Sequence, residues 1–133
     1  MICLDRYEAG TEPTARVQEI QGNLVLHMFG EIDSYIAETV MIREFSSVAS
    51  RFDKNWIIDL SGASYIDSDC LAKILKMCFE LREKGKRMVV VSNEGLVSRA
   101  IDFSEEYRIQ NRKRYDGLLR FISIELAVNH LNV

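Results

Sequence analysis

The stretch that decides the fold spans residues 56–71 and reads WIIDLSGASYIDSDCL. Residues 56–60 form a short apolar run, which is typical of a buried strand. A tight loop is expected next, after which the acid-flanked Ser68 opens an amphipathic helix. A hydroxyl in the first helical turn is exposed beside free backbone N–H groups. An added phosphate at Ser68 would therefore change surface charge and shape without damaging the core.

Outside this stretch, apolar periodicity predicts alternating strands and helices. Strands are expected at residues 15–21, 24–29, 88–91 and 118–121, and a hairpin turn at 21–23 makes the first two antiparallel. Helices are expected at residues 33–52, about 70–84, 94–103 and 123–131. Short strands separated by helices are typical of parallel pairing. We therefore expect an α/β fold with a mixed sheet and with helices mainly on one face.

One domain accounts for the chain. Its 133 residues are 47% hydrophobic and 28% charged, a composition that suits a globular core. Residues 1–14 hold Gly10, Thr11 and Pro13 without periodicity, so we expect an irregular N-terminal lead-in followed by the domain at 15–133. Residues 104–116 offer little to bury and predict a longer loop or irregular helix.

Charge and hydropathy exclude several classes of function. The net charge of −3 argues against a broad surface for nucleic acid or anionic lipid. The basic segment from Arg108 to Arg114 follows an acidic run, which favours a solvated surface. No apolar run approaches the ~18 residues that span a bilayer, and the first residues lack a signal sequence, so we predict a cytoplasmic protein without membrane insertion. Cys70 and Cys78 would lie roughly 12 Å apart along one helix, so reduced thiols are expected.

Catalytic and cofactor motifs are missing from the sequence. Neither His27 nor His130 has a companion at a metal-ligand spacing, so both are assigned to packing or surface. Residues 61–64 lack the lysine and the second glycine of a P-loop. Glu31 and Asp33 are acidic neighbours without a nucleophile at a recognisable spacing. The sequence therefore predicts no enzyme and no cofactor. The ordinary role of Ser68 is that of a helix N-cap.

Two short motifs resemble one family. Residues 30–33 read GEID and resemble the Gly-Glu-Leu-Asp turn of STAS domains, the fold of bacterial anti-sigma factor antagonists. Asp67 and Ser68 resemble the start of the Asp-Ser-x-Gly signature of the same domains. The separation of the motifs also matches, as does the order of elements from residue 24 to residue 131. The chain is therefore identified as a single STAS-like domain.

The resemblance implies a protein-interaction switch. Antagonists of this family are not catalysts: they bind a serine kinase that is also the anti-sigma factor, and this binding releases a sigma factor. The kinase uses ATP to phosphorylate the serine that matches Ser68, and a phosphatase removes the phosphate. The implied partners are thus two proteins, with no direct contact to nucleic acid, and a homodimer is left open. The implied partner-binding surface comprises Glu31, Asp33, Asp67, Ser68, Asp69 and Cys70.

Two positions depart from the family pattern. Asp69 stands where a small or hydroxylated residue is usual, and Cys70 replaces the glycine. The extra carboxylate favours the helix dipole, but it also makes the unmodified site more negative. One alternative is therefore a non-switching STAS scaffold in a signalling assembly or a membrane-transporter complex. Another is a small enzyme or ligand-binding module with a pocket near Ser68, Asp67 and Glu31, which the lack of a catalytic constellation disfavours.

Overall fold

A computed structural model describes residues 14–32, 43, 52–92, 95 and 119–133 of the chain. The described elements are, in order, β1 (Thr14–Ile20), β2 (Asn23–Ile32), β3 (Trp56–Ile66), α3 (Ser68–Glu83), β4 (Met88–Val91), β5 (Arg120–Phe121) and α5 (Ile124–Leu131). The expected lead-in up to residue 13 and the segment 104–116 lie outside the described residues. So do the helix expected at 33–52, except for residues 43 and 52, and the helix expected at 94–103, except for residue 95.

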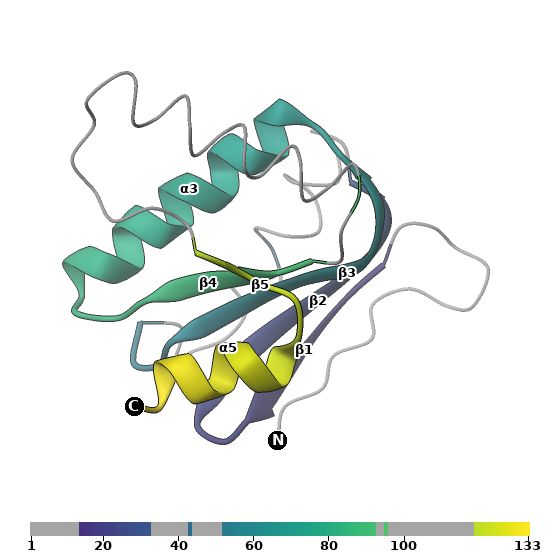
Figure 1. Cartoon of the computed structure of the whole chain (residues 1–133). Coiled ribbons are helices and arrows are strands. Elements are labelled where there is room, and N and C mark those ends of the chain that lie inside the picture. The colour runs from purple at the N-terminus through teal and green to yellow at the C-terminus, as the bar shows by residue number, and fades with distance from the viewer. Residues whose placement is uncertain (1–13, 33–42, 44–51, 93–94, 96–118) are drawn as a thin grey trace.

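The strands form one mixed sheet, as the sequence predicts, and their order in the sheet is β1-β2-β3-β4-β5 (Figure 1). β1 and β2 are antiparallel, whereas each later pair is parallel. The hairpin turns at Gln21 and Gly22, whose φ angles are 47° and 83°. Two successive positive φ values identify a type I′ turn, whose twist matches that of the strands it joins.

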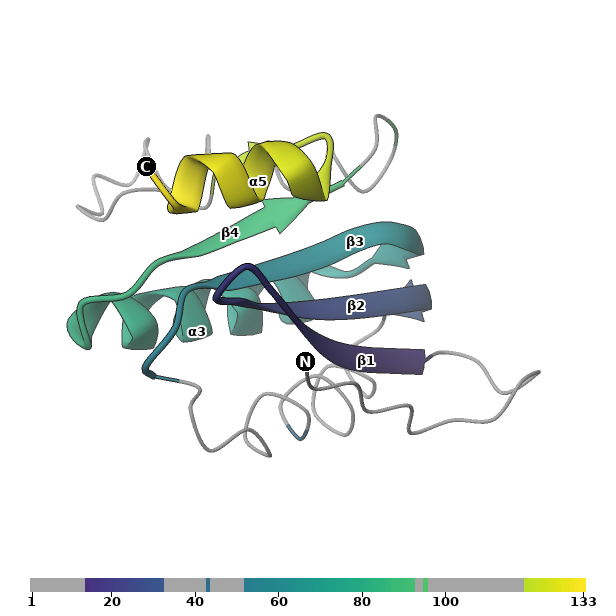
Figure 2. The ribbon, with the colours of Figure 1, turned by 90° about the horizontal axis from the view of Figure 1, so that it is seen from below.

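The sequence analysis expected helices mainly on one face, but the two described helices lie on opposite faces of the sheet (Figure 2). Side chains of β3 alternate between the faces: Trp56 and Ile58 pack in the core under α3, and Ile57 packs in the core under α5. The strands are therefore apolar on both sides, which is typical of a sheet with two covered faces. The α3 core includes Leu24, Leu26, Met28, Ile32, Leu60, Ile66, Cys70, Leu71, Ile74, Met77, Cys78, Leu81, Met88 and Val90.

The structure corrects the expected tight loop after residue 60. β3 continues to Ile66, and β2 continues to Ile32 beside it. The parallel pairing continues because β3 carries two bulges. At the first, the step from Asp59 to Gly62 in β3 lies beside the shorter step from His27 to Phe29 in β2. At the second, one further residue of β3 before Tyr65 has no partner in the register. Such bulges bend a strand without ending its pairing.

Gly62 is the position at which this bent ladder admits no side chain. A Cβ atom there would lie 2.5 Å from Cδ1 of Phe29, inside the van der Waals contact distance. The ring of Phe29 also stacks on His27, with centroids 6.4 Å apart, so it is held in place. The position of the Phe29 ring against β3 therefore depends on a glycine at residue 62, whereas the nearest β2 backbone atom, the carbonyl oxygen of Met28, lies at an ordinary contact distance of 3.5 Å.

We predict that Gly62→Ala lowers the free energy of unfolding by about 1–2 kcal/mol, since the Phe29 ring must move to admit the methyl group. Urea unfolding measures the change. Adding Phe29→Leu should relieve the clash, so in that background Gly62→Ala should lower the free energy of unfolding by less. Equal costs in both backgrounds would show that the contact with Phe29 is not the reason for the glycine.

Candidate functional site

The two sequence motifs meet where the β2–β3 ladder ends. Glu31 pairs with Tyr65, and Ile32 pairs with Ile66. The backbone N–H of Asp67 then donates to the carbonyl oxygen of Ile32 at 3.1 Å, one residue before α3 begins. The fold thus brings the turn motif beside the serine motif, as the resemblance implied. Asp33, the other acidic candidate of the turn, lies outside the described residues.

Ser68 is the first residue of α3, and Asp67 is its N-cap. The carboxylate Oδ1 of Asp67 accepts a hydrogen bond of 2.9 Å from the backbone N–H of Cys70. This finding corrects the ordinary role expected for Ser68, because the aspartate and not the serine performs the capping. The serine side chain is exposed and is not needed to start the helix.

The two departures from the family pattern have different positions. Asp69 is exposed in the first turn of α3, where its carboxylate adds negative charge beside Ser68. Cys70 is completely buried in the core under α3, and its thiol is reduced. Cys70 therefore cannot touch a partner directly, and its expected place in the partner-binding surface is wrong. Any influence of Cys70 acts through the packing of the helix.

Tyr65 is a candidate that the sequence did not single out. It is 48% exposed although it belongs to a strand, and it pairs with the exposed Glu31. A half-exposed aromatic side chain is a common anchor in protein interfaces. The sequence does carry a signal for this candidate, an aromatic residue three positions before Ser68. The signal is missed if residues 61–66 are interpreted as a loop.

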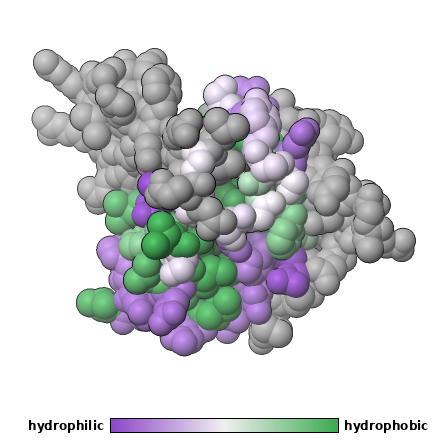
Figure 3. Space-filling model, turned by 45° about the vertical axis from the view of Figure 1, so that its right-hand side comes forward, coloured by the Kyte–Doolittle hydropathy of each residue, from purple (hydrophilic) through white to green (hydrophobic). Residues whose placement is uncertain are grey.

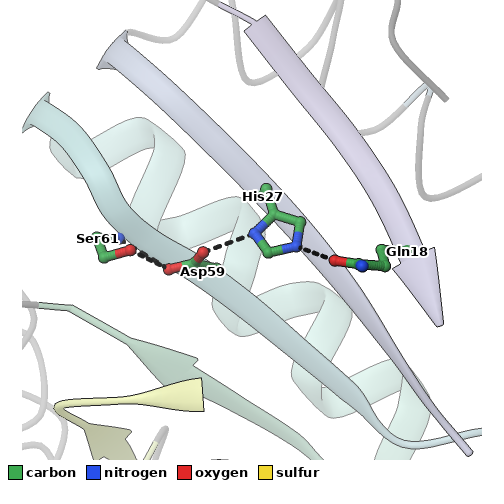
Figure 4. A network of polar contacts seen from close by, with 4 residues as sticks. All are labelled: Gln18, His27, Asp59 and Ser61. Atoms are coloured by element: carbon green, nitrogen blue, oxygen red, sulfur yellow. Dashed lines mark hydrogen bonds and ion pairs between the residues drawn. The ribbon is translucent and has the colours of Figure 1, made fainter. Parts of the chain in front are cut away.

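A buried polar network supports the bend in β3 (Figure 4). Nδ1 of His27 lies 2.6 Å from Oδ2 of Asp59, and Nε2 lies 2.8 Å from Oε1 of Gln18. Oδ1 of Asp59 accepts the backbone N–H of Ser61 at 3.0 Å and its hydroxyl at 2.6 Å. The first bulge begins at this point of the ladder, so the carboxylate accepts a hydrogen bond from a residue that has no Cα partner in the β2–β3 register.

The network stabilises the ionised form of Asp59. Burial by itself would raise the pKa of this carboxyl, but the hydrogen bonds from His27 and Ser61 outweigh burial and hold the pKa below its ordinary value of 3.8. The order of contacts is not that of a catalytic triad. Here the carboxylate lies between serine and histidine, so the histidine does not activate the hydroxyl.

Apolar surface is exposed on the side of the molecule that carries α5. Ile122 is 59% exposed and Leu126 is 47% exposed. Figure 3 shows hydrophobic surface gathered low on the molecule, next to hydrophilic surface. Ser68 stands at the start of α3 on the other face of the sheet, so this apolar surface is separate from the candidate site (Figure 1).

Metal-ligand clusters are not found among the described residues, where no three His, Cys, Asp or Glu side chains converge. The same part of the chain contains no helix long and apolar enough to cross a membrane.

Residues 14–114 match the STAS domain family, and this match covers both motifs. The chain belongs to the STAS domain family. The solved structure of an anti-sigma factor antagonist from Mycobacterium paratuberculosis matches 96% of this chain and 100% of its own, at 18% identity and a TM-score of 0.76. The anti-sigma factor antagonist SpoIIAA in its unphosphorylated form matches 89% of this chain and 97% of its own, at 16% identity and a TM-score of 0.63.

A STAS fold also occurs within a much larger protein. The murine solute carrier 26 family anion transporter matches 86% of this chain but only 18% of its own, at 22% identity and a TM-score of 0.60. At these identities, the structural likenesses establish the fold alone. They agree with the architecture expected from the sequence, a single STAS domain with a mixed sheet.

We predict that Asp59→Asn lowers the free energy of unfolding by about 1–3 kcal/mol near neutral pH, because the buried network loses its carboxylate. The folded-state pKa of Asp59 is depressed, so its contribution is present above the ordinary value of 3.8 and is lost as pH falls through the folded value. The difference in the free energy of unfolding between parent and variant should therefore become smaller as the pH falls. Denaturant unfolding at several pH values measures this difference.

The matched control is Asp53→Asn, which removes an exposed carboxylate. This variant should differ little from the parent at any pH. A gap for Asp59→Asn that stays constant down to about pH 3 would contradict the assignment of a depressed pKa.

Proposed function

We propose that this STAS domain is an anti-sigma factor antagonist: it binds an anti-sigma factor kinase, and phosphorylation of Ser68 ends that binding. The observation that carries the proposal is the position of Ser68, exposed at the first residue of α3 while Asp67 does the capping. The domain works by binding rather than by catalysis, with the kinase and a phosphatase as its protein partners in the cytoplasm.

The position of Ser68 allows modification without unfolding. A phosphate at the first residue of a helix faces the positive end of the helix dipole and the backbone N–H groups of the first turn. The 16 residues of α3 are held by a buried apolar face on the other side. Phosphorylation would therefore leave the fold intact and change only the surface.

The surroundings of Ser68 explain how a phosphate would end binding. Glu31 and Asp69 are exposed, and Asp67 adds a third carboxylate to this surface. A phosphate adds about −1.5 to −2 charges there. An interface fitted to the neutral hydroxyl would then face a desolvation cost and like-charge repulsion. Tyr65 provides an apolar contact that the modification does not alter.

The family comparison supports this assignment. SpoIIAA is described as an anti-sigma factor antagonist in its unphosphorylated form, and the Bacillus protein has also been solved in its phosphorylated form. The same fold thus accommodates both the unphosphorylated and the phosphorylated state of that protein. In this chain, the serine motif and the turn motif stand together in the same fold.

A second function is a constitutive scaffold, which Asp69 favours. The exposed carboxylate makes the unmodified surface negative already, so a phosphate changes it less. The likeness to a segment of an anion transporter supports this alternative, because there the same fold occurs within a much longer chain. In that case Ser68 remains unmodified, and the same surface holds a permanent partner.

We predict that the anti-sigma factor kinase of the source organism transfers phosphate from ATP to Ser68, because the hydroxyl is exposed at the ladder's end. Phosphopeptide mapping after incubation identifies the modified residue. Ser68→Ala should abolish the transfer, whereas Ser64→Ala removes another exposed hydroxyl from the same region and should leave it intact. Transfer that survives Ser68→Ala, or no transfer at all, would favour the scaffold.

We predict that Asp69→Ser tightens binding of the unmodified protein to that kinase about two- to fivefold and that Ser68→Asp weakens it similarly, since each changes one exposed charge. Glu83→Ser is the control, because it removes an exposed carboxylate at the far end of α3. Calorimetry measures all four proteins. If all four proteins bind the kinase equally well, the start of α3 is not part of the partner-binding surface.

A further inference from the structure

A groove lies at the end of the molecule opposite Ser68. It has a volume of about 310 Å³ and is lined by Cys78, Arg82, Lys86, Arg87, Met88, Val89, Leu119 and His130. Arg82 belongs to the last turn of α3, so it lies roughly 21 Å from Ser68 along the helix. The groove is therefore a separate feature, which the proposed switch does not use.

The lining combines basic side chains with one exposed apolar side chain. Arg82, Lys86 and Arg87 carry positive charge, and none of the described lining residues is acidic. Met88 and Val89 also line the groove, but their side chains are buried in the cores on opposite faces of the sheet, so the exposed apolar side chain is that of Leu119. A concave apolar surface with a few converging charged groups is the usual form of a small-molecule site.

The side chains of Arg87 and Lys86 differ in their contacts with the rest of the protein. Nη2 of Arg87 donates to the carbonyl oxygen of Leu131 at 3.3 Å, and Nη1 lies 3.5 Å from Nε2 of His130. These contacts fix the guanidinium at the end of α5. The side chain of Lys86 makes no hydrogen bond or ion pair in the part of the chain described by the structure, although it is half-buried. One cation is thus positioned, and its neighbour is free to bind a ligand.

We propose that this groove binds a small organic anion, a phosphate or carboxylate group attached to an apolar body. The anionic group contacts Lys86 and Arg87, since a guanidinium and an ammonium group both donate charge-assisted hydrogen bonds to such oxygens. The apolar body lies against the half-exposed Leu119, the lining residue that exposes the most apolar surface. The site does not depend on phosphorylation of Ser68.

The test is an NMR titration of the full chain, labelled with nitrogen-15, with phenyl phosphate. We expect saturable shifts of the amides of residues 86–89 and 130, with a Kd of roughly 1–5 mM for a ligand of this size. Inorganic phosphate has the charge without the apolar body, and benzyl alcohol has the ring without the charge. Each should bind at least about threefold more weakly.

Variants separate this site from general attraction to positive charge. Lys86→Gln and Arg87→Gln should each raise the Kd about threefold or more. Lys76→Gln removes an exposed cation from α3 outside the groove and should leave the Kd nearly unchanged. Lys86→Gln disturbs no described contact, so its result stands even if Arg87→Gln loosens α5. Shifts centred elsewhere, no saturation, or equal effects of Lys86→Gln and Lys76→Gln would overturn the proposal.

Discussion

The parallel ladder between β2 and β3 is the constraint on which the rest of the structure depends. It runs from Leu24 beside Trp56 to Ile32 beside Ile66, and the N–H of Asp67 extends it by one more bond to the carbonyl oxygen of Ile32. Backbone hydrogen bonds thus fix where α3 begins relative to the turn motif. The exposed surface at Ser68 can change chemically because no side-chain contact of that serine is needed to hold the two motifs together.

The bends in this ladder require buried polar contacts that a regular sheet would not need. Ser61 leaves the regular pairing, and the carboxylate of Asp59 accepts its N–H. His27 then holds that carboxylate from the neighbouring strand. A buried ionised group is costly unless it is hydrogen-bonded, and the carboxylate of Asp59 accepts two hydrogen bonds from Ser61 and lies 2.6 Å from Nδ1 of His27. The polar network is therefore part of what positions the functional surface, although it lies below it.

Local patterns explain what the sequence could predict. The hairpin follows from Gln21 and Gly22, the short strand β4 from its apolar run, and α3 from its periodic face, since each depends on neighbours in the chain. The bulged end of β3 could not be predicted in this way. Its serine, glycine and alanine residues favour a loop by composition, and only pairing with β2 keeps them extended. His27 and Asp59 are 32 residues apart, so their contact has no local signal either.

The distribution of charge along α3 connects helix stability with function. Asp67 and Asp69 stand at its N-terminus and Arg82 in its last turn, which is the arrangement that the helix dipole favours. The same arrangement gives the molecule an acidic end beside Ser68 and a basic end beside Lys86 and Arg87. These ends lie roughly 21 Å apart along the helix, more than two Debye lengths of about 8 Å at physiological salt. Screening therefore makes them electrostatically independent, so a charge added at Ser68 changes its own surface and leaves the groove unaffected.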